Sequence, residues 1–169
     1  MAVSRHLLGM QPGIDRPAIC KAMPTSRGVC HLLDLGANVE CSAEQLCQFA
    51  ILGAKAAKVM SVIRPRVGLL NLGVEAQKGS ELLQVAADAM LVGQDYDFTG
   101  FVEANQIYSG EVDVIVCDGF AGNVALKASE GVVRYISQEL FDWSGQTLFR
   151  RGLKLLISPL LKNLYRRFD

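Results

Sequence analysis

Short apolar runs alternate along the chain with longer segments in which apolar residues recur every three or four positions. The short runs are too brief for helices and predict strands over residues 18–22, 29–35, 67–72, 98–102 and 114–117. The first two flank a proline- and glycine-containing turn and predict a hairpin. Ser42 with Gln45 forms a capping box for a helix that continues to about residue 62, and Ser80 can cap a second helix over residues 81–92.

This alternation predicts the fold class. Strands that alternate with helices through short loops form a mostly parallel, doubly wound α/β sheet, because each crossover is right-handed. The carboxyl ends of parallel strands lie at one edge of such a sheet, so the loops that leave them meet there. Four polar loops, three of which contain glycine, follow the predicted strands, at residues 34–38, 71–79, 103–105 and 118–123. We therefore expect a binding site at this edge.

The last of these loops has two interpretations. A strand ends at Asp118-Gly119, and helical spacing begins at Asn123. The N–H groups of a helix's first turn suit an anion, although many strand-to-helix junctions of this kind only turn the chain. Gly119 and Gly122 allow close backbone approach, and Asn123 would place its amide at the start of the helix. Lys127, one turn later, is typical of a solvated helix lysine.

Composition narrows the class of protein. Half of the 169 residues are apolar, which suffices for the core of one ordinary domain. Lysine plus arginine equals aspartate plus glutamate, at 17 each, which argues against nucleic-acid binding by the whole chain. The five cysteines form no CxxC pair, and no signal peptide opens the sequence, so we expect reduced thiols in a cytoplasmic protein. The spacing of histidines and cysteines favours no metal site.

The carboxyl-terminal segment carries its own charge imbalance. From Phe141 onward there are six basic residues against two acidic ones, a net charge of +4. Large apolar residues recur there at helical spacing, interrupted by Gly152 and Pro159, which predicts two short amphipathic helices joined by a bend. Packing in a dimer or core is one interpretation, and the basic excess favours peripheral contact with a membrane surface. The expected contact residues are Leu153, Leu156, Ile157, Leu160 and Leu161.

Four motifs together resemble a known family. They read Leu-Asp-Leu-Gly-Ala-Asn at residues 33–38, Asn-Leu-Gly-Val-Glu-Ala-Gln-Lys-Gly at 71–79, Gly-Phe-Val-Glu-Ala-Asn at 100–105, and the segment 113–131 around Gly-Phe-Ala-Gly-Asn. Their order and spacing are similar to those of the bacterial phosphate acyltransferases of phospholipid synthesis, the PlsX type. Family members are about twice as long, so we expect a central piece with an incomplete sheet, divided into an α/β core over residues 1–140 and a basic helical segment over 141–169.

The resemblance implies a fold, an activity and a set of site residues. The fold would be similar to that of isopropylmalate dehydrogenases and phosphate acetyltransferases, in a homodimer. The reaction would move an acyl group from acyl carrier protein (acyl-ACP) to inorganic phosphate, with no cofactor and no metal. Lys78 and Asn123 match the family's active-site lysine and asparagine. The remaining loop residues expected to bind substrate or phosphate are Asn38, Asn71, Gly73, Glu75, Gly79, Glu103, Asn105, Asp118, Gly119 and Gly122.

Two other functions stay open at this point. A short-chain phosphate acetyl- or butyryltransferase would use acyl-CoA in place of acyl-ACP and would not need a basic, apolar tail. A non-catalytic module would keep only dimerisation or membrane contact. An acyl-cysteine intermediate at Cys117 is disfavoured, because this residue lies in a predicted strand with no histidine nearby in the sequence.

Overall fold

The computed structural model describes residues 9, 12–75, 78–93, 95–145, 158, 159 and 163. The chain divides into two compact units, Met1–Asn123 and Val124–Asp169. The first unit holds the sheet and the helices packed on it. In the second, most of the described residues belong to the long helix α4 (Gly119–Gly145), which starts in the first unit. Residue 140, where a division was expected, lies inside α4.

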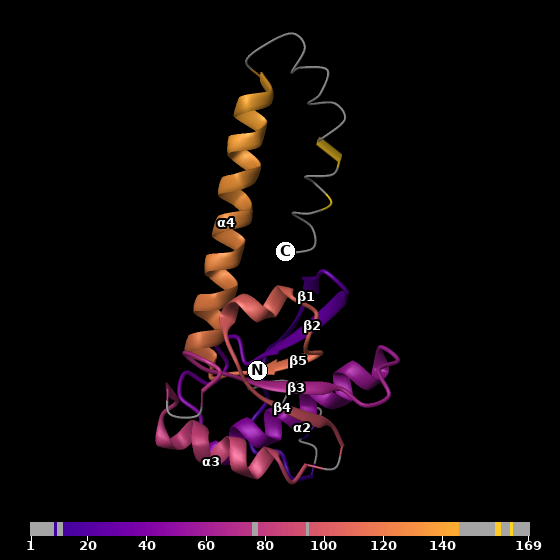
Figure 1. Cartoon of the computed structure of the whole chain (residues 1–169), viewed down its shortest axis with the longest axis vertical. Helices are drawn as coiled ribbons and strands as arrows, with labels where there is room; N and C mark the ends of the chain where they lie inside the picture. Colours follow the sequence, from indigo (N-terminus) through magenta and orange to yellow (C-terminus); the bar gives the residue numbers. More distant parts are fainter. Residues whose placement is uncertain are drawn as a thin grey trace. The chain divides into compact units, whose positions relative to one another are not determined.

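The first unit is organised around a five-stranded sheet (Figure 1). The strands are β1 (Cys20–Thr25), β2 (Gly28–Leu33), β3 (Arg66–Leu70), β4 (Asp97–Val102) and β5 (Val114–Val116). Their order across the sheet is β1-β2-β5-β3-β4. Only the β1–β2 hairpin is antiparallel, and the pairs β2–β5, β5–β3 and β3–β4 are all parallel. The predicted α/β class with a mostly parallel sheet is confirmed.

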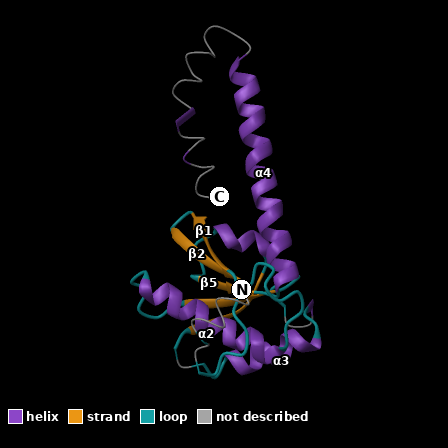
Figure 2. Cartoon of the chain, turned by 180° about the vertical axis from the view of Figure 1, so that it is seen from behind, coloured by secondary structure: helices purple, strands orange, loops and turns teal. Residues whose placement is uncertain are grey.

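The predicted helices α2 (Ala43–Val59) and α3 (Glu81–Met90) are present, and both begin at the expected caps (Figure 2). Ser42 Oγ accepts a hydrogen bond of 3.2 Å from the Gln45 N–H, and Gln45 Oε1 accepts one of 3.0 Å from the Ser42 N–H. Ser80 Oγ accepts from the Leu83 N–H at 3.3 Å. A short 3₁₀ helix, η2 (Ala104–Tyr108), follows β4. Local capping chemistry therefore determines where these helices start.

The main core lies between the sheet and the pair of helices α2 and α3. Phe49 of α2 is fully buried against strand residues that include Val67 and Val116. Gly53 lets α2 approach the sheet closely, because a Cβ at this position would overlap the side chains of Val114 and Leu33. The short helix η2 lies on the opposite side of the sheet and contacts β1 and β2. Helical segments thus cover both faces.

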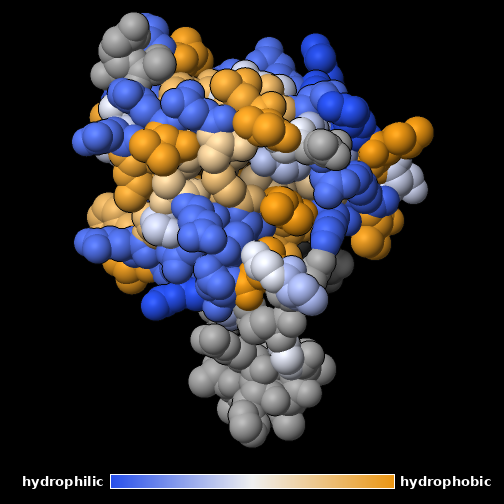
Figure 3. Space-filling model, turned by 90° about the horizontal axis from the view of Figure 1, so that it is seen from below, coloured by the Kyte–Doolittle hydropathy of each residue, from blue (hydrophilic) through white to orange (hydrophobic). Residues whose placement is uncertain are grey.

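The outer surface of the first unit mixes polar and apolar side chains. Figure 3, a view from below Figure 1, shows apolar groups scattered among charged ones. On α3 the exposed apolar side chains are Leu82 and Val85, which are three residues apart and so share one side of the helix.

The start of α4 differs from the prediction. The sequence predicts a helix that begins at Asn123, and the helix begins four residues earlier, at Gly119. Asp118 acts as its cap, because Asp118 Oδ1 accepts a hydrogen bond of 2.7 Å from the Ala121 N–H. This cap and the close packing of Gly119 and Gly122 against the loop after β2 override the low helix propensity of glycine.

Candidate active site

Four of the five strands end at one edge of the sheet. Because β2, β5, β3 and β4 run parallel in that order, the loops that follow them are neighbours in the same order. These are the four loops in which the sequence places the candidate site. The topology therefore supports the expected gathering of polar residues at the carboxyl edge.

The loop after β2 is organised by a buried carboxylate. Asp34 is fully buried and accepts hydrogen bonds from the N–H groups of Ile19 (2.8 Å), Leu35 (2.7 Å) and Asn38 (2.6 Å). The side-chain amide of Asn38 donates to Asp34 Oδ2 at 2.9 Å and to the Pro17 carbonyl at 3.0 Å. Asn38, predicted to contact substrate, is itself buried, and both of these hydrogen bonds hold the loop in shape.

Asp34 holds the loop after β2 in shape and is not among the predicted site residues. Its role could have been found from the sequence, because an aspartate directly after a buried strand, followed by glycine and then asparagine four residues on, is typical of a loop closed by side-chain acceptors.

The loop after β5 packs directly on the loop after β2. The Gly119 N–H donates to the Asn38 carbonyl at 2.7 Å, and a Cβ on Gly119 would lie 2.9 Å from the backbone of Gly36. A Cβ on Gly122 would overlap the Asp34 carbonyl. These two glycines do allow a close backbone approach, as predicted. The partner in that approach is another loop of the same protein.

The first turn of α4 is therefore only partly open to an anion. The N–H groups of Gly119 and Ala121 already donate to Asn38 and to Asp118 Oδ1. Asn123 lies in the second turn of α4 and not at its start, and its side chain is exposed. It lies beside Gly36, whose φ of +111° gives the loop a conformation that L-residues rarely adopt. Asn123 thus presents an accessible amide at the sheet edge.

The loop after β3 carries the candidate lysine. Asn71 Nδ2 donates to the Gly73 carbonyl at 3.0 Å, which fixes the first turn of the loop. Lys78 Nζ forms an ion pair of 3.0 Å with Glu75 Oε2, and both side chains are about half exposed. Gly79 then leads into Ser80, the cap of α3. This loop brings together Asn71, Gly73, Glu75 and Lys78 as one group.

Lys78 and Asn123 lie on loops that follow neighbouring strands, β3 and β5. Among the residues that the structure describes, no hydrogen bond or ion pair joins the two side chains. That they face one shared crevice stays a prediction.

The loop after β4 lies further along the edge. Glu103 N–H donates to Gln106 Oε1 at 2.8 Å, and Asn105 is exposed on η2. Because β3 lies between β4 and β5, the carboxyl ends of β4 and β5, where their loops begin, are roughly 10 Å apart across the sheet. Glu103 and Asn105 are thus closer along the edge to the Lys78 loop than to Asn123.

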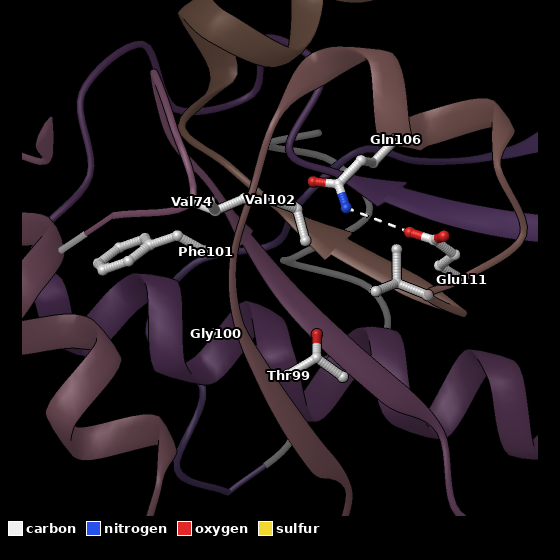
Figure 4. Close-up of a pocket in the computed structure, with 8 residues that line it drawn as sticks. Val74, Thr99, Gly100, Phe101, Val102, Gln106 and Glu111 are labelled. Carbon is white, nitrogen blue, oxygen red and sulfur yellow. Dashed lines mark hydrogen bonds between the residues drawn. The ribbon is translucent and has the colours of Figure 1, made fainter.

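A groove of about 440 Å³ lies on the η2 side of the sheet, beside β4 (Figure 4). Val74, Val102 and Val112 provide its apolar walls, and Gly100 leaves space where a side chain would stand. Gln106 Nε2 donates to Glu111 Oε2 at 3.3 Å along another wall. Val74 belongs to the same loop as Lys78, so the loop that carries the candidate lysine forms one wall of the groove.

Cys117 does not have the properties of a nucleophile. Its thiol is buried and lies within hydrogen-bonding distance of the Leu33 carbonyl, at 3.1 Å. Burial raises the pKa of the Cys117 thiol, and the nearby carboxylates Asp118 and Asp34 raise it further. The thiolate is therefore scarce at neutral pH. This agrees with the interpretation that disfavours an acyl-cysteine.

Two further features are absent from the described residues. No group of three histidine, cysteine, aspartate or glutamate side chains in that part of the chain is placed to hold a metal ion. None of its helices combines the length and apolarity needed to cross a membrane. The predicted membrane-contact residues Leu153, Leu156, Ile157, Leu160 and Leu161 lie outside the described residues.

Known proteins resemble the chain over its whole length. The profile of the family described as "Fatty acid synthesis protein" matches residues 1–169. The chain belongs to this family. A relative named "Phosphate acyltransferase" from Ectopseudomonas mendocina is 50% identical over 164 residues, which are 97% of this chain and 49% of the relative. A protein of the same name from Halorhodospira halophila is 48% identical over 170 residues, covering all of this chain and 50% of the relative.

The chain thus spans about half the length of the curated relatives it matches. Among solved structures, the EutD phosphotransacetylase from Staphylococcus aureus is similar with a TM-score of 0.64 and 17% sequence identity. The match covers 76% of this chain and 46% of that chain. At this identity the likeness supports the fold alone, in agreement with the phosphate acetyltransferase-like sheet expected from the sequence.

Proposed function

We propose that the protein takes part in moving a fatty acyl group from a thioester to inorganic phosphate, which gives an acyl phosphate for phospholipid synthesis. The observation that carries the proposal is the arrangement of the four loop motifs at one sheet edge, with an accessible lysine on the β3 loop and an accessible amide on the β5 loop. The names of the relatives support the same reaction. Membership of the family favours an acyltransferase over a binding module.

The chemistry needs an anion site and an oxyanion site. A phosphate oxygen attacks the carbonyl carbon of the thioester, a C–O bond forms, and the carbonyl oxygen takes up negative charge. The C–S bond then breaks, and the thiolate leaves with the electron pair. Lys78 can hold the phosphate as a point charge, and the amide of Asn123 can donate a hydrogen bond to the oxyanion. Both groups need only positioning, and their place on loops at one sheet edge supports this role.

The acyl donor is proposed to be acyl-ACP. The groove beside β4 supports a donor with an apolar chain, because three valines line it next to the Lys78 loop. A short-chain transferase that uses acyl-CoA is the alternative, and it would leave most of the groove unused.

We also propose a homodimer that associates peripherally with the inner face of the membrane from the cytoplasm. Within the second unit, α4 exposes apolar side chains at Val124, Val132, Ile136 and Leu140, with exposed fractions between 41% and 56%. Successive positions are four or eight residues apart, so they form a stripe that winds gradually around the helix. Such a stripe suits packing against a second copy. The basic, apolar tail supports the membrane contact.

The test incubates the purified chain with inorganic phosphate and either acyl-ACP or acyl-CoA, and follows the loss of each thioester. Loss of acyl-ACP with formation of acyl phosphate is the expected result, and loss of a short-chain acyl-CoA alone would favour the alternative. Phosphate binding is measured in parallel by ³¹P NMR, so the test is informative even if the chain converts no substrate. The proposal is overturned if the chain shows no turnover and also no phosphate binding that depends on Lys78.

A further inference from the structure

The candidate phosphate site contains a carboxylate that a phosphate group would repel. Glu75 Oε2 lies 3.0 Å from Lys78 Nζ, and the Lys78 N–H also donates to the Glu75 carbonyl at 3.1 Å. The hydrogen bond from Lys78 lowers the pKa of the Glu75 carboxyl below its ordinary value, so Glu75 is ionised at neutral pH. In this structure the positive charge of Lys78 is therefore already neutralised by its neighbour.

The ion pair lies over a fixed piece of backbone. A Cβ on Gly73 would come within 2.5 Å of Lys78 Cδ and 2.8 Å of Glu75 Oε2, so both side chains lie close against the backbone of this glycine. The Asn71 amide holds the Gly73 carbonyl at 3.0 Å. A matched surface pair, Lys58 with Asp95 at 3.1 Å, joins two elements far from this loop. The Lys78–Glu75 pair, in contrast, lies within the loop after β3.

We propose that Glu75 is the resting counter-ion of Lys78, which inorganic phosphate displaces on binding. This inference rests on the proposed role of Lys78. The motif predicts direct contact between Glu75 and phosphate, and in the present proposal Glu75 acts through Lys78 instead. Without phosphate, the pair holds the flexible, half-exposed lysine side chain over Gly73. Phosphate carries more negative charge than one carboxylate, so it can take over the ammonium. Glu75 is a positioning residue that reduces the affinity for phosphate.

The experiment measures the dissociation constant of inorganic phosphate at low salt, by ³¹P NMR, for the 169-residue chain. The variants are Glu75→Gln, Lys78→Met and the double variant, each checked for an unchanged melting temperature. We expect Glu75→Gln to bind phosphate roughly threefold to tenfold more tightly, the scale of one charge removed at an exposed site. The gain should shrink at high salt, because the charges are accessible to counter-ions. Asp95→Asn, from the matched surface pair, should leave phosphate binding unchanged.

The double variant separates action through Lys78 from simple repulsion. If Glu75 acts only by pairing with Lys78, Glu75→Gln changes nothing in the Lys78→Met background. Tighter binding by the double variant than by Lys78→Met, or unchanged or weaker binding by Glu75→Gln alone, would overturn the inference. Full phosphate affinity in Lys78→Met would instead remove the proposed role of Lys78 itself. The two failures are thus distinguishable.

A second readout follows the lysine directly. Reductive methylation with ¹³C-formaldehyde attaches ¹³C-methyl groups to lysine Nζ. The NMR signal of Lys78 is the methyl signal that is absent from the spectrum of Lys78→Met. We expect phosphate to shift this signal in the unchanged chain. We also expect the signal of phosphate-free Glu75→Gln to differ from that of the phosphate-free unchanged chain. A Lys78 signal that is the same with and without the Glu75 carboxylate would contradict the displacement.

Discussion

At the scale of single residues, Lys78 carries the largest predicted effect on activity. Lys78→Ala removes the charge that holds phosphate, and we expect acyl phosphate formation to fall by about 10²-fold or more, the scale of losing one oxyanion or phosphate donor. The measurement is the initial rate of acyl phosphate formation at fixed acyl donor. Lys58→Ala is the control, because Lys58 is also partly exposed and pairs with an aspartate away from the site loops. A near-normal rate in Lys78→Ala would exclude the role.

Asp34 carries the largest predicted effect on stability. Its carboxylate accepts hydrogen bonds from the N–H groups of Leu35 and Asn38 with no solvent exposure. Asp34→Asn replaces an acceptor oxygen with an NH₂ group that faces N–H donors, and we expect a loss of roughly 2–4 kcal/mol in the free energy of unfolding. Urea denaturation measures this loss. Asp95→Asn, an exposed aspartate, should cost under about 0.5 kcal/mol, and equal costs for the two variants would contradict the role of Asp34.

At the scale of elements, an ion pair ties β3 to the start of β5 at the amino end of the sheet. Asp113 Oδ2 accepts from the Arg66 backbone N–H at 2.8 Å and from Arg66 Nε at 3.0 Å, while Oδ1 accepts from the other guanidinium arm at 2.9 Å. Burial raises the pKa of the Asp113 carboxyl, but the hydrogen bonds and the charge of Arg66 outweigh it, and the net pKa is below the ordinary value of 3.8.

This shift fixes the sign of a pH dependence. Because the folded pKa of Asp113 is lower than the unfolded one, its contribution to stability is fully present above the unfolded value and is lost as the pH falls through the folded value. We expect the difference in unfolding free energy between the unchanged chain and Asp113→Asn to be constant from pH 7 to about pH 5 and to shrink below about pH 4. Denaturation curves across this range test it, and a difference that grows in acid would contradict it.

The elements that the sequence predicts well are those with strong local signals. Ser42 and Ser80 mark the starts of α2 and α3, because a hydroxyl cap is a local interaction that the sequence displays. The start of α4 was misplaced because two glycines in its first turn look like turn residues, whereas packing against the Asp34 loop allows a helix there. The hydrogen bonds of Asn38 are only partly visible in the sequence for a related reason: Asp34 is four residues away, but Pro17 becomes a neighbour only through the tertiary fold. Contact of Asn38 with substrate stays a prediction.

At the scale of the whole molecule, the topology supports the gathering of the predicted site loops at one sheet edge. The roles of the individual residues depend on tertiary contacts, which the sequence motifs do not show. The strands β2, β5, β3 and β4 are parallel, so a sequence that predicts parallel strands is enough to place their four loops at one edge. The pairing of Glu75 with Lys78 is different. It depends on the path of a loop around Gly73, and the sequence shows only that a lysine and a glutamate are three residues apart.

The last prediction concerns the association with membranes. The tail has a net charge of +4 from Phe141 onward, with large aliphatic residues at helical spacing. We expect the chain to co-sediment with vesicles that contain anionic lipid and to be released as salt rises, because each basic residue near the surface contributes on the order of 1 kcal/mol. Replacing Leu156 and Leu160 with glutamate should abolish co-sedimentation, since both the apolar contact and the favourable charge are lost.

A matched control exists on α3, where Leu82 and Val85 are also exposed aliphatic residues on one side of a helix. Replacing these two with glutamate adds the same charge to the protein, so it separates a specific tail contact from the general effect of lower net charge. Vesicle binding should survive in the α3 variant and disappear in the tail variant. If the tail variant still binds vesicles but no longer forms dimers in sedimentation equilibrium, the apolar residues of the tail contact a second copy of the chain, and the alternative of a protein interface is correct.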